Sequence, residues 1–316
     1  MPTRDGYGEG LVEAGERDER VVVLCADLKE STRSAAFAEK FPNRFIEVGV
    51  AEQALVTIAA GMANYGKIPF VSSFAVFSPG RNWEQIRMTV GLSDLPVKIA
   101  GSHAGVSVGP DGASHQMLED LAIMRVMPNM TVIASCDAIE TKKAVLEAAK
   151  TKKPVYLRFA REKSPVFTSA DSPFKIGRAE IFWQTKDPQV AIIACGPLVY
   201  QALLAARQLE KNRINCLVIN CHTLKPMDER AIIRAAKLTG AVVTVEEHQV
   251  IGGLAGAVAE VLAKNFPTPI EFVGMNDSFG ESGQAKELLK KYGMRADDIV
   301  IAAKRVIRRK SLEKGL

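Results

Sequence analysis

The chain has 316 residues, enough for two domains of ordinary size, and 47% of them are hydrophobic, 24% charged and 6% aromatic. This composition is typical of a soluble globular protein and excludes a disordered or fibrous one. The first ten residues contain no apolar run like that of a signal peptide, and no apolar stretch reaches the roughly 20 residues that cross a bilayer. We expect a cytoplasmic protein that does not contact a membrane.

The net charge of +5 lies entirely in the last segment, because six basic residues and one acid follow position 303 and the rest of the chain is balanced. A basic tail can bind nucleic acid, but basic residues are also common at helix ends, where they complement the helix dipole. We therefore predict a solvated helix end and no nucleic-acid binding. The five cysteines lie mostly in apolar runs without a CxxC pair, so we predict buried, reduced side chains and neither disulfides nor metal ligands.

Short Val- and Ile-rich runs alternate with longer amphipathic or Ala-rich stretches along the first half of the chain. Continuous apolar strands between helices are typical of a parallel sheet with both faces covered. The predicted strands are 21–27, 44–49, 68–74, 96–102, 131–135 and 154–159, and the predicted helices are 51–66, 80–92, 115–127 and 137–150.

Residues 161–188 interrupt this alternation with Pro, Ser and charged residues. The alternation then resumes with predicted strands at 189–196, 214–221, 241–248 and 269–275, and with helices that begin at Leu198, Asp228, Gly253 and Glu281. We predict an α/β fold of two doubly wound domains, a mainly parallel first domain at 1–165 and a smaller one at 189–316, joined by a linker at 166–188.

Two glycine-containing segments resemble anion-binding motifs. Residues 61–68, GMANYGKI, nearly match a P-loop, but Ile68 lacks the metal-binding hydroxyl and the glycines end a helix instead of preceding one. In IGGLAGA, 251–257, the glycines follow a strand and open a helix, where backbone N–H groups can hold an anion. Close packing of strand and helix is the preferred explanation there.

Three features carry candidate chemistry. Glu52 is the only charged residue between Glu47 and Lys67 and begins an apolar helix. It is either a first-turn acid that complements the helix dipole or a partly buried carboxyl that desolvation keeps ready to exchange a proton. Phe74 and Phe77, which follow a strand, are either core residues or face the cleft where α/β folds bind ligands.

The third feature is SHAGVSVGPDGASHQ, residues 102–116, in which His103 and His115 flank a Gly-rich loop that contains Asp111. The 12-residue separation of the two histidines matches no common zinc spacing. A polar loop after a strand is a usual place for substrate-binding residues, and we prefer that interpretation.

Taken together, GVAEQ around Glu52, the SSFAVF…IR block, and HAG…GPDGASHQ followed by LRF-AR resemble the C-terminal half of transketolases. That half consists of a pyrimidine-binding domain and the domain after it. The resemblance covers nearly the whole chain, and its three motifs occur in the family's order. It implies a thiamine-diphosphate enzyme that transfers a two-carbon ketol unit from a ketose phosphate to an aldose phosphate, with a role in the pentose phosphate pathway.

The resemblance also implies roles for individual residues. Glu52 matches the glutamate that hydrogen-bonds the aminopyrimidine ring of the cofactor and shuttles a proton. Phe77 matches the aromatic that stacks on that ring, with Phe74 beside it, and Asp27 matches an acidic position near the cofactor. Positions that contact the sugar hydroxyls or the phosphate of the substrate are matched by Arg4, Ser31, His103, Asp111, His115 and Arg161.

The sequence departs from the family's pattern in two ways. Ser78-Pro79-Gly80 stands where members often have a third aromatic, so we expect a differently lined cofactor or sugar channel. The GDG…N segment through which the family's N-terminal domain holds Mg²⁺ or Ca²⁺ and the diphosphate does not occur in the chain. We therefore expect no metal ligands here, and an α2β2 assembly with an N-terminal transketolase subunit that binds the metal.

Several alternatives stay open. The chain resembles, less well, half of a 1-deoxyxylulose-5-phosphate synthase or of another ketose-phosphate enzyme that uses thiamine diphosphate, and it could be a non-catalytic assembly partner. The DGASHQ loop argues against a 2-oxo-acid dehydrogenase β subunit, and the lack of a convincing GxGxxG after the first strand argues against a nicotinamide dehydrogenase. VEEH, 245–248, and NDSFGESG, 276–283, resemble the family's last domain, and we expect His248 to be structural or interfacial.

Overall fold

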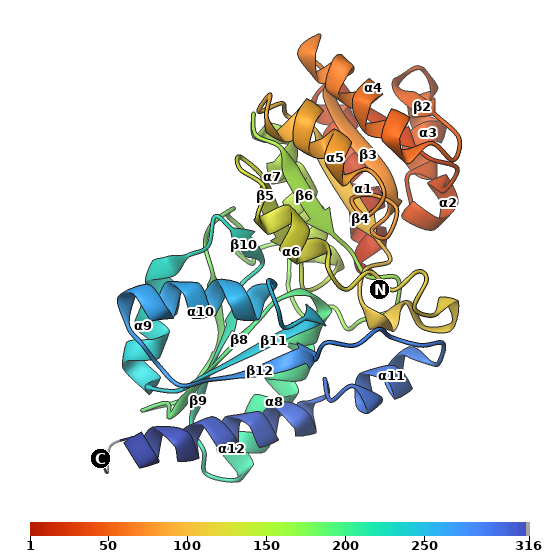
Figure 1. Ribbon diagram of the computed structural model, residues 1–316. Helices are drawn as coiled ribbons and strands as arrows, with labels where there is room; N and C mark the ends of the chain where they lie inside the picture. Colours follow the sequence, from red (N-terminus) through yellow and green to blue (C-terminus); the bar gives the residue numbers. More distant parts are fainter. Residues whose placement is uncertain (314–316) are drawn as a thin grey trace.

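A computed structural model describes residues 1–313 of the chain, with side chains as far as Ser311. Within these residues, seven strands form a first sheet in the order β10-β5-β6-β4-β3-β1-β2, and only β10 runs antiparallel to its neighbour (Figure 1). The strands are β1 (Val21–Cys25), β2 (Phe45–Glu47), β3 (Ile68–Phe74), β4 (Lys98–Ser102), β5 (Thr131–Ala134), β6 (Val155–Arg158) and β10 (Thr223–Lys225). The predicted parallel sheet is thus confirmed, and an antiparallel strand from the second half of the chain extends it.

Helices cover both faces of the first sheet because its strands are apolar on both sides. In β1, Val21 and Val23 pack toward α1 and α7, whereas Val22 and Leu24 pack toward α4. The first face is covered by α1 (Thr3–Arg17), α3 (Ala35–Lys40) and α7 (Ala138–Lys150); the second by α4 (Glu52–Asn64), α5 (Trp83–Gln85), the π-helical η2 (Ile86–Gly91) and α6 (Asp120–Arg125). Shorter segments are α2 (Lys29–Thr32), η1 (Pro42–Arg44) and η3 (Val106–Asp111).

The second sheet has five strands among the described residues, in the order β12-β11-β8-β9-β7. Its strands are β7 (Glu180–Gln184), β8 (Val190–Ala194), β9 (Cys216–Asn220), β11 (Val242–Gln249) and β12 (Ile270–Met275). Strand β7 falls inside the stretch predicted to be a linker and pairs antiparallel with β9 at the sheet edge. Helices α8 (Val199–Lys211) and α12 (Ala296–Glu313), with η4 (Gly196–Leu198), lie on one face, and α9 (Glu229–Thr239) and α10 (Leu254–Asn265) lie on the other; α11 (Ala285–Lys291) packs against η3.

Helix α1 is absent from the elements predicted from sequence because four glycines within it lower its helix propensity. Tertiary packing explains those glycines. A Cβ added to Gly6 would lie 2.0 Å from the carbonyl oxygen of Ala138, and one added to Gly10 would lie 2.8 Å from Cβ of Val145. The missing side chains therefore let the backbones of α1 and α7 approach closely, and this contact places Arg4 at the edge of the first sheet.

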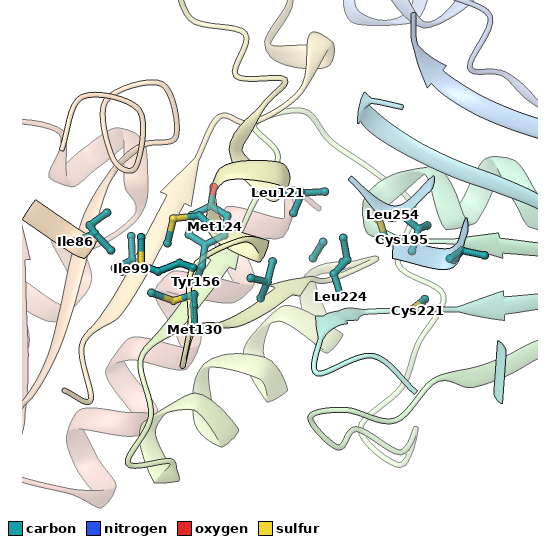
Figure 2. Close-up of a cluster of buried hydrophobic side chains, with 14 of the residues drawn as sticks. Ile86, Ile99, Leu121, Met124, Met130, Tyr156, Cys195, Cys221, Leu224 and Leu254 are labelled. Carbon is teal, nitrogen blue, oxygen red and sulfur yellow. The ribbon is translucent and has the colours of Figure 1, made fainter. Parts of the chain in front are cut away.

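The two α/β units share one continuous hydrophobic core. It runs from the face of the first sheet under α4 and α6 to the face of the second sheet under α9 and α10. Figure 2 shows part of it, from Ile86 and Ile99 in the first unit to Cys195 and Leu254 in the second. Such a shared apolar core fixes the orientation of the two units.

A buried polar network crosses the same boundary. Asp120 accepts hydrogen bonds from Tyr156 and from Nε of Arg158, both at 2.7 Å, and Nη2 of Arg158 donates to the carbonyl of Glu247 in β11 at 2.8 Å. His248 is fully buried beside it, and Nε2 of His248 accepts a hydrogen bond from the backbone N–H of Ala122 at 3.4 Å. His248, expected to be structural or interfacial, thus lies buried at the boundary between the two units.

Other sequence-based predictions are also settled by the fold. All five cysteines are buried as free thiols, and the glycine-punctuated segment 61–68 runs from the last turn of α4 to the first residue of β3. At the start of α10, the N–H groups of Leu254 and Ala255 donate to the carboxyl oxygens of Glu246, both at 2.7 Å. The carboxyl group of a side chain of the same protein therefore occupies that helix start.

The basic C-terminal segment forms the exposed end of α12, as predicted. Lys304, Arg305, Arg308 and Arg309 are exposed, and Lys314 lies outside the described residues. Arg305 and Arg309 both pair with Glu271, at 3.2 and 2.7 Å. Within the described chain, none of the helices has the length and apolar composition needed to cross a membrane.

Candidate active site

The residues predicted to act together lie along one edge of the first sheet, where its parallel strands end. Asp27 and Ser31 follow β1, Phe74 ends β3, His103 follows β4, and Arg161 follows β6. Strand β1 lies between β2 and β3, so the chain leaves β1 and β3 in different directions. A crevice at such a divergence of carboxyl ends is where α/β sheets bind ligands.

Glu52 is the first residue of α4, and its side chain is only 2% exposed. Nη1 of Arg81 donates to its Oε2 at 2.8 Å, and Nδ2 of Asn82 donates to its backbone carbonyl at 2.7 Å. Burial of Glu52 is therefore as expected, but its surroundings are not purely apolar. In this structure the guanidinium of Arg81 forms an ion pair with the Glu52 carboxylate.

Aromatic rings form a wall that Arg81 connects to Glu52. The rings of Phe74 and Phe77 are nearly parallel, with centroids 6.0 Å apart and an interplanar angle of 14°. His103 stacks on Phe74 with a centroid distance of 3.7 Å, and His115 meets Phe74 and Phe77 edge-on, at 6.3 and 5.7 Å. Phe77 is only half-buried, so one part of the wall stays open to a ligand.

His103 is held in one protonation state and one tautomer. Its Nε2 lies 3.3 Å from Nη1 of Arg4 and its Nδ1 lies 2.9 Å from Oγ of Ser102. Because arginine only donates, Nε2 is the acceptor and the proton is on Nδ1. Burial, followed by the positive charges of Arg4 and Arg161, lowers the pKa of His103 to about 3, so the ring is neutral. Its φ of 58° is uncommon for a residue other than glycine, a strain often found at functional sites.

Positive charge gathers on the other side of His103. Nη1 of Arg4 donates to the backbone carbonyl of Ser31 at 2.8 Å, and burial, followed by the nearby charge of Arg33, lowers the pKa of Arg4. Arg161 pairs with Asp111 at 3.0 Å and donates to the carbonyl of Val108 at 3.1 Å. About a third of each side chain of this pair is exposed, so both can be reached by a ligand.

Asp27 is the predicted site residue with the weakest connection to the others. It is exposed with a φ of 58°, and its backbone N–H donates to Oε1 of Glu47 at 2.8 Å. The same oxygen accepts from the N–H of Gly49 at 3.0 Å, so Glu47 ties the turn after β1 to the segment leading into α4. Among the described residues, the Asp27 carboxyl has no hydrogen-bond partner.

The second domain supports the loop that carries Asp111 and His115. The N–H of Ser107 donates to Oε1 of Glu247 at 2.6 Å, and Nε2 of Gln116 donates to the carbonyl of Glu281 at 2.9 Å. These contacts give a structural role to the VEEH and NDSFGESG segments. Sequence reasoning did not single out Arg81, Asn82 or Glu47, although Arg81 stands in the block quoted for the aromatic pair.

The site fits a flat, nitrogen-containing aromatic ring. It offers a buried carboxyl to a ring nitrogen and an aromatic wall to a ring face. The guanidinium of Arg81, which is also flat and rich in N–H donors, already lies over Phe77 with its carbon 4.9 Å from the ring centroid. Among the described residues, no group of three or more His, Cys, Asp or Glu side chains is arranged to hold a metal ion.

Comparison with known families assigns the chain. The family described as "Transketolase, pyrimidine binding domain" matches residues 1–166, and the family described as "Transketolase, C-terminal domain" matches residues 177–299. The chain belongs to the transketolase family, a family of thiamine-diphosphate enzymes. Within that family it corresponds to the C-terminal half, the pyrimidine-binding domain together with the domain that follows it.

Similar proteins of nearly the same length are known. A protein of Methanocaldococcus jannaschii named as a transketolase C-terminal section is 47% identical over 307 residues, 96% of this chain and 95% of that protein. The 6-deoxy-6-sulfo-D-fructose transketolase subunit SqwH of a Clostridium species is 41% identical over 308 residues, 98% of this chain and 95% of that protein. The solved structure of a split-gene transketolase, an inactive β4 tetramer, superposes with a TM-score of 0.92 at 46% identity, covering 98% of this chain and 99% of that one.

Proposed function

We propose that this chain is the C-terminal subunit of a transketolase whose N-terminal half is a separate polypeptide, and that the two assemble as α2β2. The proposal is supported by relatives of the same length that are named as a C-terminal section, a subunit and a split-gene product. The observation that carries it is the position of Glu52, which is buried at the start of α4 and is connected through Arg81 to the ring of Phe77.

The residues of this chain fit one half of a cofactor site. Thiamine diphosphate supplies the carbon nucleophile of the family's chemistry when it is bound. Glu52 would hydrogen-bond a pyrimidine nitrogen and move a proton there, because its carboxyl group lies at the buried start of α4. Phe77, with Phe74 behind it, would position the ring, and Asp27 would lie near the cofactor. The metal, Mg²⁺ or Ca²⁺, and the diphosphate would be held by the partner subunit.

Sugar-phosphate recognition is assigned to the residues on the other side of the aromatic wall. Arg161 offers a planar fork of donors that suits phosphate oxygens, and Arg4 lies near enough for its pKa to be influenced by the charge of Arg161. Half-buried His115 would hydrogen-bond a sugar hydroxyl, and His103 would do so if a hydroxyl replaces Arg4 at its Nε2. Asp111 and Ser31 lie in the same region. These groups would orient a ketose phosphate donor and then an aldose phosphate acceptor.

The test is reconstitution with an N-terminal transketolase subunit, thiamine diphosphate and Mg²⁺. Xylulose 5-phosphate and ribose 5-phosphate should yield sedoheptulose 7-phosphate, which chromatography with mass detection measures. Release of carbon dioxide from pyruvate with no sedoheptulose 7-phosphate would instead indicate a synthase-like enzyme. Assembly without turnover of any of these substrates would indicate a non-catalytic partner.

A second donor is favoured by one comparison, the 41% identity to a 6-deoxy-6-sulfo-D-fructose transketolase subunit. A sulfonate presents the same array of anionic oxygens to Arg161 as a phosphate does, with one charge fewer at neutral pH. Replacing xylulose 5-phosphate by 6-deoxy-6-sulfofructose in the same assay distinguishes the two donors, and the larger kcat/KM identifies the preferred one.

A further inference from the structure

Arg81 lies between the two groups that define the pyrimidine site. Its Nη1 donates to Oε2 of Glu52 at 2.8 Å, and its guanidinium carbon lies over the ring of Phe77, 4.9 Å from the centroid. The arginine side chain is 50% exposed, whereas that of Glu52 is 2% exposed. One end of the contact is therefore fixed and buried, and the other end can move into solvent.

The backbone that carries Arg81 is fixed by a tight turn after β3. The N–H of Gly80 donates to the carbonyl of Ala75 at 3.1 Å, and that of Arg81 to the carbonyl of Phe77 at 2.9 Å. A Cβ on Gly80 would lie 2.1 Å from the carbonyl oxygen of Val76, so this turn excludes any larger residue. The guanidinium can therefore leave Glu52 by rotation of its own side chain, without a backbone change.

The guanidinium shares the chemical features that the proposed function assigns to the aminopyrimidine. It is planar, it stacks on an aromatic face, and it presents N–H donors to a carboxylate. We propose that Arg81 is a placeholder: in the cofactor-free chain its guanidinium occupies the position of the pyrimidine ring between Phe77 and Glu52, and cofactor binding displaces it into solvent. This inference rests on the proposed function and adds a gating residue to it.

Two consequences follow from the geometry. The placeholder compensates the buried Glu52 carboxylate before the cofactor arrives, since an uncompensated buried charge is strongly destabilising. It also competes with the cofactor, because both need the same carboxyl oxygen and the same face of Phe77. Removal of the Arg81 side chain should therefore speed cofactor binding and leave a vacancy that a small guanidinium can fill.

The first measurement is cofactor binding to the reconstituted complex by stopped-flow tryptophan fluorescence. Arg81→Ala should bind thiamine diphosphate about tenfold faster than the unaltered complex, equivalent to about 1.4 kcal/mol. The matched control is Arg87→Ala, which removes an exposed arginine of η2 whose side chain contacts Met88 and not Glu52. Added ethylguanidinium should slow binding to Arg81→Ala and leave the unaltered complex and the control unchanged.

The second measurement uses the full chain alone and is independent of catalysis. Ethylguanidinium should raise the Tm of Arg81→Ala by filling the vacated place, and should not raise that of the unaltered chain or of the double variant Arg81→Ala/Glu52→Gln. Equal binding rates together with no response to ethylguanidinium would overturn the placeholder and leave the proposed function standing. An unaltered complex that binds no thiamine diphosphate would instead refute the proposed function, and the placeholder with it.

Discussion

The buried network between the two domains yields the sharpest stability prediction. The Asp120 side chain is fully buried and accepts hydrogen bonds from Tyr156 and Arg158. The side chain of Arg158 is 5% exposed. Asp120→Asn keeps the shape of the side chain but removes the charge that compensates Arg158. Because Arg158 also donates to the carbonyl of Glu247, the change weakens the link to the second domain as well.

Breaking a buried pair so that one charge is left uncompensated costs about 3 kcal/mol. Arg305→Gln is the control for an exposed pair, because Arg305 pairs with Glu271 at 3.2 Å and its own side chain is 61% exposed. An exposed pair of this kind contributes less than about 1 kcal/mol. Urea unfolding of the full chain, followed by far-UV circular dichroism, compares the two free energies of unfolding. Equal losses for both variants would refute the role assigned to the buried network.

Three further predictions concern the site and the pH dependence. Glu52→Gln should abolish turnover of the reconstituted complex while size-exclusion chromatography shows unchanged assembly; retained turnover would favour the scaffold alternative. Arg161→Gln should raise the KM for a phosphorylated donor by about tenfold or more through loss of charged hydrogen bonds and should leave the KM for an unphosphorylated ketose unchanged; a uniform rise would place Arg161 outside phosphate recognition. Burial lowers the pKa of His248 from its usual 6.5 to about 4. Between these two pH values the unfolded chain binds a proton at this residue that the folded chain does not bind. The free energy of unfolding therefore falls as the pH decreases from about 6.5 to about 4. His248→Gln lacks this titrating group, so the difference in free energy of unfolding between the variant and the unaltered chain, measured by urea unfolding, should shift in favour of the variant as the pH falls over that range. Burial raises the pKa of Glu246 to about 7, which acts in the opposite direction but equally in both proteins. A difference that stays constant at all pH values would contradict this assignment.

The regular part of the fold is predictable because its signal is local. The apolar runs that form β1, β3, β8 and β9 are buried on both faces, and such runs are visible in the sequence. Helix α1 is not predictable in this way, since its glycines are explained only by contact with α7. Strand β7 is similarly hidden, because its edge position leaves its residues partly exposed and without a continuous apolar run.

The site was predictable where residues lie at the ends of strands. His103, Phe74 and Arg161 follow three neighbouring strands, so the topology brings them to one edge. The contact of Arg81 with Glu52 depends on a side-chain direction set by the turn at Gly80, which no periodic pattern encodes. Nor does the sequence pattern indicate that Glu247 reaches the N–H of Ser107, since that contact joins two separate domains.

The most direct test is the position of the cofactor in a crystal structure of this chain with an N-terminal transketolase subunit and thiamine diphosphate. We expect the aminopyrimidine ring to stack on Phe77, with a ring nitrogen about 2.7–3.2 Å from a Glu52 oxygen and with Arg81 turned toward solvent. Thiamine diphosphate bound away from α4, or a Glu52 side chain that faces bulk water, would contradict the assignment of this chain as half of the active site.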